Sequence, residues 1–120
     1  MSYDFYKVMH FLGLFMFFTA LGGQFVQAIN GGDPKQQPGR RWMGMFHGIG
    51  LLLVLVAGFG LSAKLGVGFP GWVIAKLVIW VILGGIGALA ARKRSLAGML
   101  WVLTVTLGMV AAYLARVKPF

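Results

Sequence analysis

The chain has 120 residues, of which 59% are hydrophobic and only 11% are charged. A water-soluble domain carries about 25% charged residues, so this composition excludes an ordinary soluble globular protein. The net charge of +9 comes from Lys and Arg residues that mostly lie at the ends of apolar runs. Basic residues at such positions meet lipid head groups. This placement excludes a nucleic-acid-binding protein.

Four apolar segments follow one another along the chain, over about residues 5–29, 42–63, 70–91 and 96–115. Each is long enough to cross a bilayer, because a helix needs about 20 residues for that distance. The connections contain Gly-Gly, prolines and basic clusters, which end helices, and they are short. The sequence therefore predicts an all-α, up-down bundle of four transmembrane helices that forms a single membrane domain over residues 1–120. Small residues at four-residue spacing, such as Gly44 with Gly48, predict close helix packing.

The basic residues predict the orientation of the bundle in a cell (inner) membrane. Six lie in the first and third connections, namely Lys35, Arg40, Arg41, Arg92, Lys93 and Arg94. Four lie on the side of the two termini, namely Lys7, Lys64, Arg116 and Lys118. Connections rich in Lys and Arg stay in the cytoplasm, so we expect a multi-pass protein with both termini outside it. The first segment lacks a preceding basic region, so we expect a retained helix rather than a signal peptide.

Two ionisable residues lie inside the predicted spans, near the side of the termini. Lys76 is about six residues into the third segment, and His10 has a similar depth in the first, because both helices run in the same direction. Ionisable groups within spans usually face the bundle interior and mark a site, so both are candidate cofactor-binding residues. The alternatives are a lysine whose amine extends to the head groups and a histidine hydrogen-bonded at the interface.

His47 and Met43 share one face of the second helix, which begins on the opposite side of the membrane. Met and His side chains bind soft metals such as copper. Two ligands do not complete a copper site, however, and methionine is a common filler of apolar contacts. We therefore expect no metal site. If one existed, His47 and Met43 would be its candidate ligands.

Two stretches of the chain resemble a known family. Residues 6–22, YKVMHFLGLFMFFTALG, are similar to the opening helix of the small four-helix bacterial membrane protoporphyrinogen oxidases and the related copper-resistance and SirB-like membrane proteins. Residues 71–77, GWVIAKL, resemble their third helix, where a lysine lies near the start. In the oxidases a histidine of the first helix and a lysine of the third belong to the haem or porphyrin site. The resemblance implies these roles for His10 and Lys76, with haem b or a porphyrin as cofactor.

Other chemistry has little support in the sequence. Asp4 and Asp33 are the only carboxylates, they lie on opposite sides of the predicted membrane, and the chain has no cysteine. A carboxylate pair and a thiol nucleophile are therefore excluded. Proton-driven transporters normally carry acidic groups in their spans, and these spans have none.

Three functions remain open. The sequence favours a non-catalytic accessory subunit of a larger membrane complex, such as an electron-transfer or photosynthetic complex, because polar groups are few and small and aromatic residues are abundant. Its partners would be lipid and either other membrane subunits or copies of itself. The first alternative is a haem- or porphyrin-binding redox protein using His10 and Lys76, which as an enzyme would be a porphyrin- or haem-linked oxidoreductase. The second is a small transporter, for which the polar groups are Gln24, Gln27, Thr104 and Thr106.

Overall fold

The computed structural model describes residues 2–31, 36–66 and 68–118, and this part of the chain is all-α. In chain order it contains α1 (Tyr3–Asn30), α2 (Arg40–Leu65), α3 (Gly71–Arg92), the short 3-10 helix η2 (Arg94–Leu96) and α4 (Ala97–Val117). The four long helices match the four predicted apolar segments to within two residues at each end. Each is long and apolar enough to cross a membrane.

The helices end where the sequence supplies capping residues. Ser2 precedes α1, and its Oγ accepts a hydrogen bond from the Phe5 amide at 3.1 Å, which satisfies one of the free N–H groups of the first turn. Gly31 follows α1 with φ at 78°, and Gly66 follows α2 with φ at 69°. Glycine adopts positive φ without the steric cost that a side chain imposes, so both helices stop at the start of their connections.

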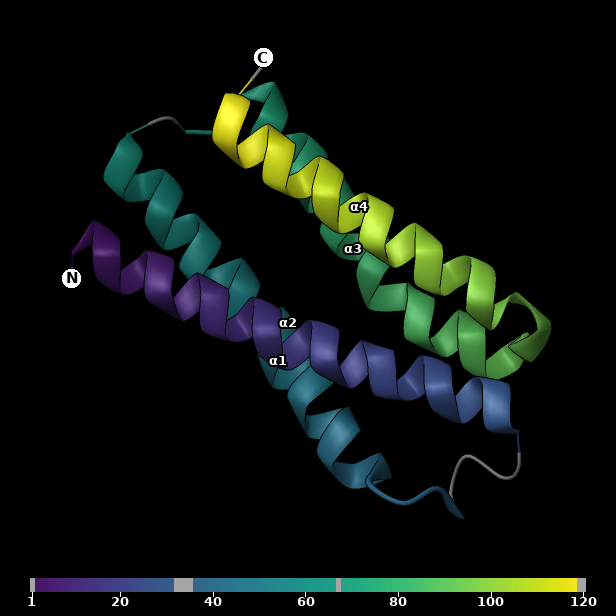
Figure 1. The fold of residues 1–120 in the computed structure, drawn as a ribbon. Helices are drawn as coiled ribbons and strands as arrows, with labels where there is room; N and C mark the ends of the chain where they lie inside the picture. Colours follow the sequence, from purple (N-terminus) through teal and green to yellow (C-terminus); the bar gives the residue numbers. More distant parts are fainter. Residues whose placement is uncertain (1, 32–35, 67, 119–120) are drawn as a thin grey trace.

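Two antiparallel pairs make up the molecule, α1 with α2 and α3 with α4 (Figure 1). Helix α1 is central, because it contacts α2, α3 and α4, whereas α2 packs against α1 and touches α3 only lightly. Both termini and the α2–α3 connection lie toward one end of the molecule, and the other two connections lie toward the opposite end (Figure 1). We call the first the terminal end and the second the loop end.

Helices α1 and α2 cross in backbone contact at two glycines. A Cβ atom built on Gly50 would lie 2.7 Å from the Phe17 nitrogen and 2.8 Å from the Gly13 oxygen. A Cβ atom on Gly13 would in turn lie 2.8 Å from the Gly50 oxygen. The expected Gly44–Gly48 pair makes no such contact, since a Cβ atom on either would meet no described atom within 4 Å. Close packing of α2 therefore depends on Gly50, on the face opposite to the predicted one.

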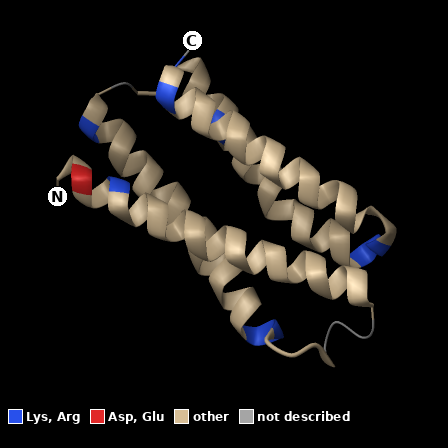
Figure 2. Ribbon diagram, in the orientation of Figure 1, with Lys and Arg blue, Asp and Glu red and all other residues tan. Residues whose placement is uncertain are grey.

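The buried core lies between α1, α3 and α4, and the outer faces are apolar. Core side chains include Phe17, Leu21, Phe25, Leu83, Ile86 and Leu100. Large apolar side chains are exposed on the other faces, including Leu52 and Val56 of α2 and Val102 and Met109 of α4. The described Lys and Arg residues lie toward the two ends and leave the middle of the molecule uncharged (Figure 2). A surface with this pattern indicates a multi-pass membrane protein.

Candidate functional site

His10 of α1 faces α2, where a backbone carbonyl holds its ring. Its Nδ1 lies 3.0 Å from the Val54 oxygen. A carbonyl oxygen can only accept, so Nδ1 carries a proton and donates it, and in the neutral form of the ring the lone pair is then on Nε2. A Cβ atom built on Gly58 would lie 3.4 Å from Cε1 of the ring, an ordinary contact, so the imidazole packs directly against α2 at Gly58.

Lys76 of α3 lies near His10. The two are close enough for the charge of the amine to act on the imidazole, and the Lys76 side chain is half-buried. The residues that the sequence singles out on two different helices therefore lie within electrostatic range of each other, toward the terminal end. They lie near each other because α1 and α3 run in the same direction and are in contact.

Lys118 is a neighbour of this pair that sequence reasoning missed. Its charge acts on Lys76, its Nζ donates to the Ala115 oxygen at 2.7 Å, and the same Nζ lies 5.3 Å from the centre of the Trp72 ring. A cation is stabilised there, at the negative end of α4. Lys118 thus adds a second positive charge beside Lys76. Its sequence position shows only that it follows the fourth apolar segment, whereas its contact with Trp72 requires α4 to pack on α3.

His47 and Met43 lie elsewhere, on the face of α2 that packs against α1. The His47 ring is tilted against the Phe17 ring with 4.9 Å between their centres, and the Met43 sulfur lies against Gly23. Phe17 is seven residues beyond His10 along α1, or about 10 Å at 1.5 Å per residue, so the two histidines occupy different levels. Within residues 2–31, 36–66 and 68–118, no three His, Cys, Asp or Glu side chains gather as a metal site would require.

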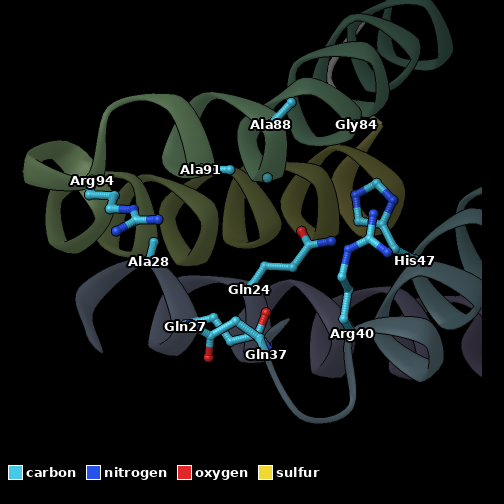
Figure 3. A pocket seen from close by; sticks show the side chains of 11 residues that line it. Gln24, Gln27, Ala28, Gln37, Arg40, His47, Gly84, Ala88, Ala91 and Arg94 are labelled. Atoms are coloured by element: carbon cyan, nitrogen blue, oxygen red, sulfur yellow. The ribbon is translucent and has the colours of Figure 1, made fainter. Parts of the chain in front are cut away.

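A cavity of about 310 Å³ with both polar and apolar lining opens at the loop end (Figure 3). Its polar lining comes from α1, α2, η2 and the connection before α2, and consists of Gln24, Gln27, Gln37, Arg40, His47 and Arg94. Gln24 Oε1 and His47 Nε2 are buried and have no hydrogen-bond partner in the described part of the chain. Gln24 lies near the end of one apolar segment and His47 near the start of the next. Because consecutive segments run in opposite directions, the sequence places both residues at a similar depth. Their shared cavity with Arg40 was not predicted.

We compared the chain with protein-family models, with curated proteins and with solved structures, and none of the three comparisons found a match. The resemblance of residues 6–22 and 71–77 to the protoporphyrinogen oxidases therefore stays a prediction.

Proposed function

We propose that the protein is a membrane protein that holds a haem or a porphyrin at His10, with Lys76 beside it. The observation that carries the proposal is the hydrogen bond of 3.0 Å from His10 Nδ1 to the Val54 oxygen. Histidines that bind metals commonly donate their other ring N–H to a carbonyl or carboxylate oxygen, which leaves the lone pair of Nε2 for the metal. The α1–α2 contact alone gives His10 this tautomer.

The side-chain chemistry at His10 suits such a group, because histidine is a common ligand of haem iron. Lys76 and Lys118, the latter with its Nζ 5.3 Å from the centre of the Trp72 ring, are basic side chains that would suit the carboxylates of a porphyrin. The bound group would supply redox chemistry. The protein would contribute the position of the group, through His10, and the binding of its carboxylates, through Lys76.

An optical spectrum of the purified protein, before and after addition of haem b, tests the proposal. We expect a haem absorption band in the wild type and its loss in His10→Asn. Asparagine can still donate a hydrogen bond to the Val54 oxygen, so the variant should fold normally. It lacks the second ring nitrogen of histidine, so it should not bind the haem iron. The matched control is His47→Asn at the other end of the molecule, which should keep the band. A colourless wild type that binds no added haem, or a His10→Asn variant that keeps the band, would show the proposal to be wrong.

A second candidate function, the accessory subunit of a larger membrane complex, is favoured by the position of α2. This helix packs against α1 and touches α3 only lightly, and it exposes Ile49, Leu52 and Val56. We propose that neighbouring membrane subunits or further copies of the chain cover this face. Since the chain has no cysteine, Val56→Cys introduces a single thiol for cross-linking in native membranes. A discrete cross-linked product would support the role, whereas labelling only by lipid-soluble reagents would count against it.

The proposed orientation places both termini outside the cytoplasm and the loop end inside. The loop end carries Arg40, Arg41, Arg92, Lys93 and Arg94 among the described residues, more than the terminal end presents at its surface. Tags on each terminus should therefore be accessible to protease in intact spheroplasts. Protection of both tags would reverse the orientation.

A further inference from the structure

Two glutamines that line the cavity at the loop end bind the backbone around it through their side-chain amides. Gln27 Nε2 donates to the Pro38 oxygen at 3.0 Å, and Gln37 Nε2 donates to the Gly31 oxygen at 2.6 Å. These bonds join the end of α1 to the segment before α2. Gln24 is the third glutamine of the lining, and its Oε1 has no hydrogen-bond partner among the described residues.

Two buried polar atoms in the wall have no hydrogen-bond partner among the described residues, Gln24 Oε1 and His47 Nε2. Buried polar atoms in proteins are almost always satisfied by protein, water or ligand, and both residues line this cavity. In Figure 3 the Gln24 amide nitrogen points toward Arg40 and His47, so this amide can donate to a ligand there, and His47 presents a donor when Nε2 carries the proton. Gly87 provides the room opposite, because a Cβ atom there would collide with the Gln24 amide.

The charge around the cavity is positive. In Figure 3 the Arg40 side chain and the His47 ring lie on one side of the Gln24 amide, and Arg94 lies on the other. Arg40 opens α2, whose first turn contains no acidic residue and receives no side-chain cap from Gly39, so the first N–H groups of α2 add partial positive charge. Asp4, the only carboxylate in the described part of the chain, belongs to the first turn of α1 at the terminal end.

We propose that this cavity binds a phosphate group, with the Arg40 guanidinium and the side chains of Gln24 and His47 as its donors. A guanidinium donates to two phosphate oxygens at once, and the neutral donors bind the remaining ones. The volume of about 310 Å³ is at the lower end of the range for small-molecule sites, about 300 to 1,000 Å³, and admits a phosphate with the group attached to it. At this end of the apolar helices the phosphate comes either from an anionic phospholipid head group or from a soluble phosphate compound.

Two binding measurements on the purified protein test the site and separate the two sources. Native mass spectrometry measures retention of phosphatidylglycerol, with phosphatidylcholine as the comparison lipid, and isothermal titration in detergent measures binding of inorganic phosphate. The cavity variants are Arg40→Gln and Gln24→Leu. The control is Arg116→Gln, the same change at an exposed arginine of the terminal end. We expect wild type and control to bind alike and each cavity variant to bind about tenfold more weakly, as loss of a charge-assisted or buried hydrogen bond implies.

Preferential retention of phosphatidylglycerol without affinity for inorganic phosphate would identify a lipid head group as the ligand. Affinity for inorganic phosphate would identify a soluble phosphate compound. Either result supports the site when a cavity variant that circular dichroism shows to be folded binds more weakly than the wild type. The proposal is overturned if the wild type binds neither ligand, if folded Arg40→Gln and Gln24→Leu bind as tightly as the wild type, or if Arg116→Gln weakens binding as much as Arg40→Gln does.

Discussion

Replacing Gly50 with alanine should force α1 and α2 apart at their crossing. The new Cβ atom would lie 2.7 Å from the Phe17 nitrogen, 2.8 Å from the Gly13 oxygen and 3.0 Å from the Met16 Cβ. None of these atoms can rotate away, because two belong to the backbone of α1 and the third is attached directly to it. Reaching an ordinary contact of 3.4 Å from 2.7 Å requires the helices to separate by about 0.7 Å.

The magnitude follows from two opposing effects on the free energy of unfolding. Overpacking of this kind costs about 1 to 3 kcal/mol, while alanine in a helix interior is more favourable than glycine by up to about 1 kcal/mol. Gly48→Ala, two residues earlier in α2, experiences only the second effect, because a Cβ atom there meets no described atom within 4 Å. The two variants should therefore differ by about 1 to 3 kcal/mol, with Gly50→Ala the less stable.

Unfolding by sodium dodecyl sulfate, followed by circular dichroism from a mild detergent, measures this difference. Gly13→Ala should destabilise in the same way, and the Gly13→Ala/Gly50→Ala double variant should lose less than the sum, because the first alanine already separates the helices. Equal midpoints for Gly50→Ala and Gly48→Ala would refute the backbone contact, and strict additivity of the double variant would refute the shared crossing.

Three further changes test other contacts by the same unfolding measurement. Trp80→Phe removes the hydrogen bond of 2.9 Å from Nε1 to the Leu51 oxygen, which joins α3 to α2. The free energy of unfolding should fall by about 0.6 to 1 kcal/mol. An unchanged midpoint would mean that this bond does not hold α2 in place. Gly87→Ala collides with the end of the flexible Gln24 side chain and should stay within about 0.5 kcal/mol of wild type; a large loss would show that Gln24 cannot move. Ser2→Ala removes the cap of α1 and should cost about 1 kcal/mol, which stability equal to wild type would contradict.

The helices themselves, and the level of each polar residue along them, could be predicted from the sequence. Apolar length and helix-ending residues are local properties, so α1 to α4 match the predicted segments closely. The depth of His10 and Lys76 follows from counting residues along parallel helices at 1.5 Å per residue. For the same reason the sequence places Gln24 and His47 at one level near the loop end, although it does not show that they share a cavity.

Which faces of these helices meet was decided only by the tertiary structure. The chain has nineteen glycines, and four-residue spacing indicates Gly44–Gly48, whereas the helices cross at Gly13 and Gly50. Choosing between such pairs requires the backbones to be placed against each other, since apolar side chains all round a membrane helix leave no amphipathic face to identify its partner. Three features depend on that packing: the hydrogen bond from His10 to Val54, the approach of Lys118 to Lys76 and the cavity beside Arg40. Only the tertiary structure shows them, because each joins residues of different helices.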